Sequence, residues 1–177
     1  MKLVVLDRDG TINHDSDRFI KSPAEWKPIA GSLEAIARLT QADWRVVVAT
    51  NQSGIERGLF DVATLHQIHA EMHRRVNQAG GRIDAIFFCP HRADSRCECR
   101  KPKAGMLLEI AERLNVELRD VPMVGDGQRD LLAAAAVGAK PYLVLTGKGT
   151  KTREAGELPP GTEVLPDLAA VAARLAP

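Results

Sequence analysis

The chain has 177 residues, enough for one compact α/β domain with its own core. Its 24 lysine and arginine residues nearly balance 23 aspartate and glutamate residues, so the net charge of +1 gives no electrostatic reason to expect nucleic acid or a membrane as partner. No apolar run approaches the roughly 20 residues of a membrane span. The first strand-like segment begins at residue 2, which leaves no space for a signal peptide. We therefore expect a cytoplasmic protein that works as a monomer.

Strand-like and helix-like segments alternate along the chain. Strands are predicted at residues 2–7, 44–49, 83–88, 121–124 and 141–145, and helices at residues 32–42, 62–79, 104–115, 128–137 and 167–175. Ser32 and Asp61 are expected to cap helices, Gly80 and Gly138 to end them, and residues 147–163 to form a surface loop. The alternation predicts a doubly wound, mostly parallel sheet of order 3-2-1-4-5 in a single domain over residues 1–177.

The first predicted strand ends abruptly in two carboxylates. Residues 3–11 read Leu-Val-Val-Leu-Asp-Arg-Asp-Gly-Thr, so Asp7 and Asp9 follow a run that is typical of a strand buried on both faces. Open α/β sheets bind ligands at the carboxyl ends of their strands, and two acids there favour a bound cation. The alternative is an ordinary turn, where Asp and Gly are common.

Polar residues also follow the second predicted strand. Residues 50–54 read Thr-Asn-Gln-Ser-Gly, and hydroxyl and amide groups of this kind can bind phosphate oxygens without adding charge. Thr50, Asn51, Gln52 and Ser53 are therefore candidates for phosphate binding. The alternative is a polar turn.

A third acidic cluster follows the fourth predicted strand. In a sheet of order 3-2-1-4-5, the first and fourth strands are neighbours, which would place Asp126 beside Asp7 and Asp9. Carboxylates from two adjacent strand ends suit a hard cation such as Mg²⁺. Asp130 comes one helical turn later, where it could support the site or simply occupy the favourable first turn of a helix.

Three basic residues, Arg100, Lys101 and Lys103, precede a predicted helix, and such a group suits a doubly charged phosphoryl group. Just before them, all three cysteines and one histidine fall within eleven positions: Cys89, His91, Cys97 and Cys99. Four such ligands can complete a closed tetrahedral Zn²⁺ site of structural type, although a chance cluster of reduced thiols is the alternative. The histidines at 66, 69 and 73 are interpreted as a solvated helix face.

These clusters, in this order, resemble the haloacid dehalogenase superfamily of phosphatases. The matching residues are Asp7-Arg8-Asp9-Gly10-Thr11, Thr50-Asn51, Lys101, and Gly125-Asp126 with Asp130. The Thr-Asn-Gln-Ser-Gly form of the second motif and the stretch from Cys99 to Met106 are most similar to the heptose bisphosphate branch, with the histidinol-phosphate branch next.

The resemblance implies a role for each matching residue. Asp7 corresponds to the nucleophile that forms an aspartyl-phosphate, and Asp9 to the acid and base that serves the leaving oxygen and then water. Thr50 and Lys101 correspond to groups that stabilise the transferring phosphoryl, and Arg100 to a substrate-recognition residue. Mg²⁺ would be held by the Asp7 carboxylate, the Asp9 backbone carbonyl and Asp126. Asp9 must begin protonated, which we expect its crowded acidic surroundings to favour.

The resemblance also places substrate contacts at four residues of one loop: Asp15, Ser16, Asp17 and Arg18. Only 38 residues, 12–49, separate the first two motifs, too few for an inserted cap domain beside a helix and a strand, so we expect an open site. The resemblance implies that this site removes the 7-phosphate of a sugar bisphosphate. Other phosphatase substrates remain alternatives, namely histidinol phosphate and a polynucleotide 3′-phosphate. So do a phospho-accepting signalling domain and a zinc-binding interaction module.

Overall fold

Six parallel strands form one sheet in the order β3-β2-β1-β4-β5-β6 in the computed structural model, which describes residues 1–177. The strands are β1 (Lys2–Leu6), β2 (Trp44–Asn51), β3 (Ala85–Cys89), β4 (Pro122–Gly125), β5 (Lys140–Val144) and β6 (Glu163–Leu165). The predicted fold class and the order of the first five strands are confirmed. The sixth strand is not among the predicted ones.

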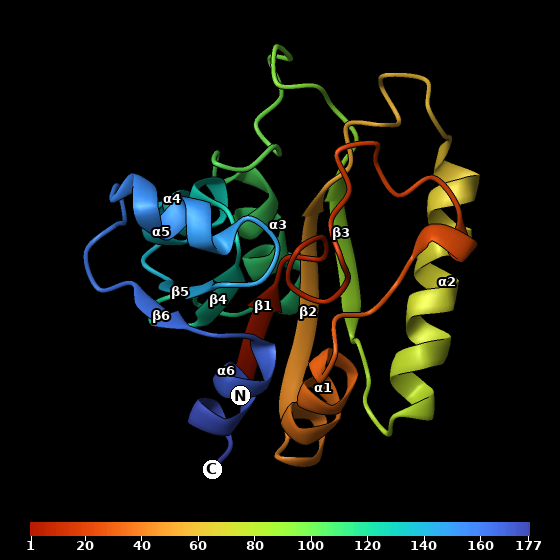
Figure 1. Cartoon of the computed structure of the whole chain (residues 1–177). Coiled ribbons are helices and arrows are strands. Elements are labelled where there is room, and N and C mark those ends of the chain that lie inside the picture. Colours follow the sequence, from red (N-terminus) through yellow and green to blue (C-terminus); the bar gives the residue numbers. More distant parts are fainter.

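Helices cover both faces of the sheet (Figure 1). One apolar cluster packs α1 (Ser32–Gln41), α2 (Val62–Gln78) and α6 (Leu168–Leu175) against one face, and a second packs α3 (Gly105–Leu114) and α4 (Gln128–Ala136) against the other. Alternate residues of β1 serve the two clusters, as the two-residue period of a strand requires: Val4 and Leu6 join the first, Leu3 and Val5 the second. No helix combines the length and apolar character needed to cross a membrane.

Three of the four predicted helix boundaries are confirmed. Asp61 accepts a hydrogen bond from the Thr64 N–H (2.8 Å), and Gly80 and Gly138 follow their helices at φ of 85° and 71°. The expectation for Ser32 is wrong, because the helix is capped by Gly31 and Ser32 is its first residue. The Ser32 hydroxyl instead donates to the Ile12 carbonyl (2.7 Å), which ties α1 to the loop after β1.

The expected surface loop at 147–163 contains two short elements. They are α5 (Gly149–Ala155) and the start of β6, and a 3₁₀ turn η1 (Pro23–Glu25) lies in the long segment after β1. The missed α5 is mostly polar and the missed β6 has only three residues, so neither shows the apolar periodicity that identifies an element from sequence. The N-terminus lies at the end of the sheet where the strands begin, and the C-terminus lies on the same side of the molecule. The loop that follows β3 rises from the opposite end, where the strands finish (Figure 1).

Candidate active site

The carboxyl ends of β1 and β4 bring Asp7 and Asp126 together. The two strands are paired in register, with Leu6 opposite Val124, and the Asp7 N–H donates to the Val124 carbonyl (2.8 Å). Asp7 directly follows β1, and Asp126 directly follows β4. Asp7, Asp126 and Asp130 each place a carboxylate oxygen within 4.8 Å of the others, and all three residues are buried. The predicted juxtaposition of the first and fourth strand ends is confirmed.

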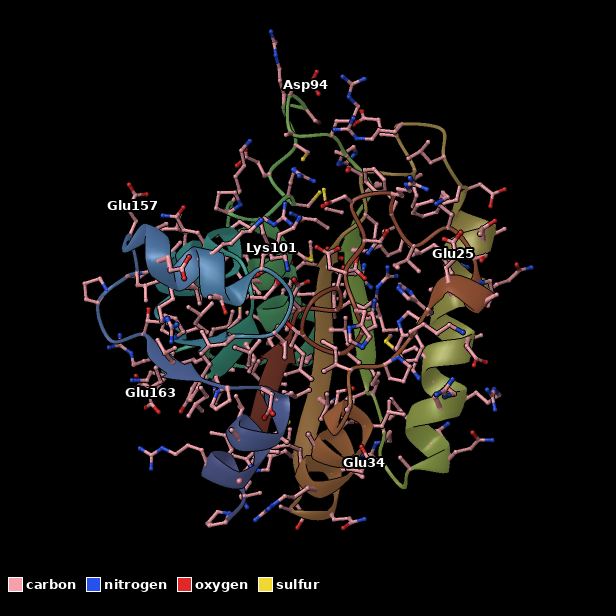
Figure 2. The ribbon with its side chains drawn as sticks, in the orientation of Figure 1. Glu25, Glu34, Asp94, Lys101, Glu157 and Glu163 are labelled. Atoms are coloured by element: carbon pink, nitrogen blue, oxygen red, sulfur yellow. The ribbon has the colours of Figure 1, made fainter.

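Lys101, which is labelled in Figure 2, contacts two of these acids. Its side chain is only 1% exposed, and its Nζ lies 2.9 Å from Asp7 Oδ1, 2.6 Å from Asp130 Oδ1 and 2.7 Å from the Ala49 carbonyl oxygen. The Asn51 side chain holds the Lys101 backbone, donating to its carbonyl (3.0 Å) and accepting from its N–H (3.1 Å). Lys103 is exposed and pairs with Glu98 (3.2 Å), so Lys101 is the lysine that reaches the acids.

The acids carry more negative charge than Lys101 balances. Burial, together with the Asp130 charge, raises the pKa of Asp7 to about 6, although Lys101 opposes the shift. Burial and then the charges of Asp7 and Asp130 raise the pKa of Asp126 to about 8. Three carboxylates thus face one ammonium group in a buried pocket, and a divalent cation would supply the missing positive charge.

The donor atoms fit Mg²⁺ at the predicted ligands. The Asp7 Oδ1 atom accepts from Lys101 and from the Arg8 N–H (2.8 Å), and Asp126 Oδ2 accepts from the Lys148 N–H (2.7 Å), which leaves one oxygen of each acid free for a cation. Asp130 uses both of its oxygens on Lys101 and the Gly127 N–H (3.1 Å), so it supports Lys101 rather than offering a ligand.

Two glycines make room for Asp126. A Cβ atom on Gly10 would lie 2.0 Å from Asp126 Oδ2, and one on Gly147 would lie 2.2 Å from the same atom. Both residues also have positive φ, 81° and 56°, which glycine adopts without steric cost. The loops after β1 and β5 therefore close around this carboxylate as only glycine permits.

The surroundings of Asp9 are not acidic, so the expectation that crowded acids favour its protonated form is wrong. Its carboxylate accepts from Arg8 Nε (2.9 Å) and Nη2 (3.2 Å), from the Asn13 amide (2.9 Å) and from the Gln52 amide (3.1 Å). Burial alone would raise the pKa of Asp9, but the Arg8 charge and these hydrogen bonds outweigh it and lower that pKa. Asp9 is therefore ionised in the free protein.

The polar residues at the end of β2 are tied to the same network. The Gln52 amide donates to Thr50 Oγ1 (2.9 Å) as well as to Asp9. Thr50, Asn51, Gln52 and Ser53 all line one cavity together with Asp7, Asp9 and Lys101. The strand end thus both shapes the cavity wall and fixes the Asp9 carboxylate.

This cavity has a volume of about 250 Å³ and a strongly charged lining. Asp15, Ser16, Asp17 and Arg100 line it as predicted, whereas Arg18 is exposed and lies outside the lining. The sequence analysis missed three lining cations: Arg57, Arg129 and Lys148. The Lys148 Nζ lies 3.3 Å from Asp15 Oδ2 and 3.7 Å from Asp17 Oδ1. Arg57 and Lys148 lie on exposed loops and Arg129 in the first turn of α4, and nothing in their local pattern distinguishes them from ordinary surface charges.

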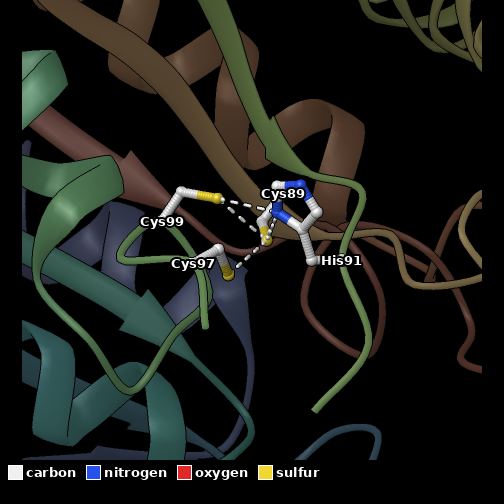
Figure 3. Close-up of side chains that lie close together, drawn as sticks. All are labelled: Cys89, His91, Cys97 and Cys99. Atoms are coloured by element: carbon white, nitrogen blue, oxygen red, sulfur yellow. Dashed lines mark hydrogen bonds between the residues drawn. The ribbon is translucent and has the colours of Figure 1, made fainter. Parts of the chain in front are cut away.

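The cysteine cluster forms as predicted (Figure 3). Cys89 Sγ lies 3.1 Å from Cys99 Sγ, 3.8 Å from Cys97 Sγ and 3.5 Å from His91 Nδ1, and no disulfide forms. Burial and then the adjacent Cys99 thiol raise the pKa of Cys89 to about 12, so its thiolate requires a cation. Three thiols and an imidazole with ligand atoms within 4.8 Å of one another fit a closed Zn²⁺ site.

The interpretation of the α2 histidines as a solvated face is wrong for one of them. His66 is exposed and His73 is half-buried, but His69 is 6% exposed and its Nε2 lies 3.1 Å from Arg8 Nη1. Ile68 and Met72, its neighbours on α2, belong to the apolar cluster under the helix, and the buried face of the helix extends to His69.

Comparisons with known proteins agree with this geometry. A HAD-hydrolase-like family model matches residues 98–171. A D-glycero-β-D-manno-heptose-1,7-bisphosphate 7-phosphatase from Bordetella bronchiseptica is 62% identical over 175 residues, covering 99% of this chain and 98% of that protein, and one from Pseudomonas putida is 54% identical with 99% of each chain covered.

A solved structure is similar over its whole length. The crystal structure of D,D-heptose 1,7-bisphosphate phosphatase from B. bronchiseptica, complexed with magnesium and phosphate, superposes with a TM-score of 0.97 over 99% of this chain and 98% of that one, at 62% identity. A fold and site of this kind define a phosphatase, that is, a phosphoric monoester hydrolase. The chain belongs to the HAD-like hydrolases, in the branch of the heptose bisphosphate phosphatases.

Proposed function

We propose that this enzyme removes the 7-phosphate of D-glycero-β-D-manno-heptose 1,7-bisphosphate through an aspartyl-phosphate on Asp7. The observation that carries the proposal is the buried contact of Asp7 with Lys101 (2.9 Å) beneath a cavity whose rim is lined by cations. The activity for which the relatives that are 62% and 54% identical over their whole length are named supports this substrate.

The chain's own residues account for the first chemical step. A carboxylate that attacks a phosphate dianion meets like charge, which positive charge at the phosphoryl oxygens must offset. Lys101 provides a fixed ammonium group beside Asp7, and Asp130 and the Ala49 carbonyl hold that group in place. Thr50 adds a hydroxyl at the same cavity wall. Mg²⁺, held by Asp7, Asp126 and the Asp9 carbonyl, would neutralise charge on the transferring phosphoryl group.

Asp9 donates a proton to the leaving oxygen and later accepts one from water. The leaving sugar oxygen is a strong base and needs a proton as the bond from phosphorus to oxygen breaks. Asp9 is ionised in the free enzyme, so it must take up a proton when the negatively charged substrate arrives beside it. Once the sugar has left, the ionised carboxylate can accept a proton from the water that hydrolyses the aspartyl-phosphate.

The rim of the cavity suits the second phosphate of a bisphosphate. Arg57, Arg100, Arg129 and Lys148 line the cavity, and none of them lies within salt-bridge distance of Asp7, Asp9 or Asp126. Three of these residues, Arg57, Arg100 and Arg129, make no ion pair with any acid of the chain, whereas Lys148 pairs with Asp15 and Asp17. A substrate that is anchored by its anomeric phosphate at this rim would present its distal 7-phosphate to Asp7.

We also propose how the enzyme works in the cell. Residues 1–177 act as one catalytic unit, because residues from the whole length between Asp7 and Lys148 line one cavity. Three free cysteines suit a reducing compartment such as the cytoplasm. The cavity is built by one copy of the chain, which supports a monomer.

Phosphate release decides between the substrates. The purified enzyme with Mg²⁺ is expected to hydrolyse the heptose 1,7-bisphosphate over many turnovers, and more efficiently than histidinol phosphate or a polynucleotide 3′-phosphate. NMR of the product should show loss of the 7-phosphate and retention of the anomeric one. Faster turnover of histidinol phosphate would overturn the substrate. A single stable phosphorylation without turnover would favour a signalling domain, and zinc binding without either activity would favour an interaction module.

A further inference from the structure

Arg8 is buried between Asp9 and His69, a histidine that has no role in the reaction described above. The Arg8 side chain is fully buried, and its Nε and Nη2 atoms grip the two oxygens of Asp9 at 2.9 Å and 3.2 Å. Its third nitrogen, Nη1, lies 3.1 Å from His69 Nε2 on α2. The guanidinium therefore bridges a helix on one face of the sheet to the Asp9 carboxylate in the cavity.

The chemistry of this contact fixes the form of His69. A guanidinium only donates hydrogen bonds, so His69 Nε2 must accept, and the ring must be neutral with its proton on Nδ1. Burial, followed by the Arg8 charge, lowers the pKa of His69 to about 3, in agreement with a neutral ring. His69 thus acts as a permanent acceptor for Arg8 at any pH at which the enzyme works.

The planarity of the guanidinium couples its two ends. All three nitrogens lie in one rigid plane, so a group that fixes Nη1 also fixes the direction in which Nε and Nη2 point. The Arg8 backbone is already held, because its carbonyl accepts from the Ile12 N–H (2.8 Å). His69 supplies the remaining constraint, and the Asp9 carboxyl plane follows the orientation of Arg8.

We propose that His69 is a positioning residue that acts through Arg8 to hold the Asp9 carboxyl in line with the leaving oxygen of the substrate. The proposal rests on the proposed phosphatase function. In the step concerned, the carboxyl proton of Asp9 passes to the leaving oxygen while the bond from that oxygen to phosphorus breaks and a bond from phosphorus to an Asp7 oxygen forms. The orientation of the Asp9 carboxyl toward the leaving oxygen matters because proton transfer requires hydrogen-bond geometry.

A comparison of kcat/KM for two substrates with different leaving groups separates a loss of Asp9 positioning from general damage to the enzyme. The ratio kcat/KM reports steps up to loss of the leaving group, so the later role of Asp9 toward water does not enter it. A sugar alkoxide needs the proton, whereas p-nitrophenolate leaves without one. His69→Phe fills the ring's volume but removes the acceptor. It should lower kcat/KM for the heptose bisphosphate by about 10–100-fold and that for p-nitrophenyl phosphate by less than about threefold.

Two further variants sharpen the test. His69→Gln keeps an acceptor and should stay within about threefold of the wild type on both substrates, and His66→Phe, an exposed histidine one turn earlier on the same helix, should change neither. If His69→Phe does not fold, as judged by circular dichroism and Tm, His69→Leu replaces it. Equal losses on both esters, or no loss in the folded variant, would overturn the proposal while the phosphatase function stood. A wild-type enzyme that turned over neither ester would instead overturn the phosphatase function itself.

Discussion

The two candidate metal sites lie at the same edge of the sheet but differ in chemistry. The acidic site uses oxygens of Asp7 and Asp126, which directly follow β1 and β4, and opens into a cavity. The cysteine site begins with Cys89, the last residue of β3, and has four sulfur and nitrogen ligands. Hard oxygen donors with a free side suit Mg²⁺ and a reacting phosphate, whereas four soft or borderline donors close around Zn²⁺ and leave no position for substrate.

The comparison also shows how one site depends on the other. Arg100 and Lys101 directly follow Cys99, and Arg100 donates to the His91 carbonyl (3.1 Å), which joins the two ends of the cysteine loop. The loop therefore fixes the start of the segment that carries Lys101 to Asp7. A closed zinc site would act on catalysis only by holding that segment, while the acidic site would act on the phosphate itself.

The largest effect is expected from Asp7→Asn. Removal of the nucleophile should lower kcat by at least about 10⁴-fold, because a neutral amide cannot form the aspartyl-phosphate. Zinc content should stay at one ion per chain, since the cysteine site does not include Asp7. Phosphate release and metal analysis of the purified protein measure both results. Asp94→Asn, at the exposed tip of the cysteine loop, is the matched control and should retain full activity. Residual multiple turnover above a tenth of wild type would exclude Asp7 as the nucleophile.

Cys97→Ser should have the next largest effect. Loss of one thiolate opens the zinc site, so the purified variant should lack zinc and its Tm should fall by about 5–10 °C, equivalent to roughly 2–3 kcal/mol in a chain of this size. Activity should fall with it, because Arg100 and Lys101 lose their anchor. Calorimetry, zinc analysis and phosphate release give the three values. Arg96→Ser alters the adjacent exposed residue and should change none of them. Full activity with unchanged zinc content would contradict the proposed dependence of the acidic site on the cysteine site.

Much of the acidic site could be predicted from the sequence, because it depends on strand ends. An apolar run that stops at an acid places that acid at the sheet edge, and the strand order then puts Asp126 beside Asp7. The Asp9 environment could not be predicted in this way. Arg8 is its neighbour in sequence, but the Asp9 carboxylate is also held by Asn13 and Gln52, and Arg8 contacts His69. These three residues come from different segments of the chain.

The missed elements have a similar explanation. The β6 strand has three residues and α5 has seven, mostly polar, so neither shows a periodic apolar pattern. Lys148 enters the site only because the loop after β5 folds over Asp126, with its N–H 2.7 Å from the Asp126 carboxylate. Ser32 is a favourable capping residue by type, but its hydroxyl found a partner in the distant Ile12 carbonyl. Long-range contacts of this kind leave no local signal.

The pH dependence of stability separates the acidic site from the cysteine site. The pKa of Asp126 is raised to about 8 in the fold, so the folded state holds a proton that the unfolded state has lost. Without Mg²⁺, the contribution of Asp126 to stability should therefore fall as pH rises from 6.5 to 8, by about 1 kcal/mol per pH unit. The lowered pKa of His69 acts with the opposite sign, but chiefly below pH 6.5, outside this window, whereas Cys97, whose pKa is lowered to about 6, opposes the Asp126 slope inside it.

Urea unfolding at several pH values measures this slope. Asp126→Asn should flatten it, and saturating Mg²⁺ should flatten it in the wild type, because a bound cation replaces the proton. Cys97→Ser should make the fall in stability steeper, because it removes a thiol whose lowered pKa opposes the Asp126 slope in this window. A wild-type slope that Asp126→Asn leaves unchanged would mean that another group titrates.

The smallest effects are expected from replacing two cations that line the cavity, one near each of the two candidate metal sites. Arg100 comes from the cysteine loop and is half-buried, and Arg129 follows Asp126 and is exposed. Arg100→Ala should raise KM for the bisphosphate by about tenfold, whereas Arg129→Ala should raise it by about two- to fivefold, because water screens an exposed charge more strongly. Arg119→Ala, exposed and outside the cavity, is the control. For p-nitrophenyl phosphate, which lacks a second phosphate, KM should not change in any of the three. The increase in KM caused by Arg129→Ala should shrink in 0.5 M salt more than the increase caused by Arg100→Ala. That result would show that the cysteine loop supplies the less hydrated, and therefore more selective, contact to the second phosphate.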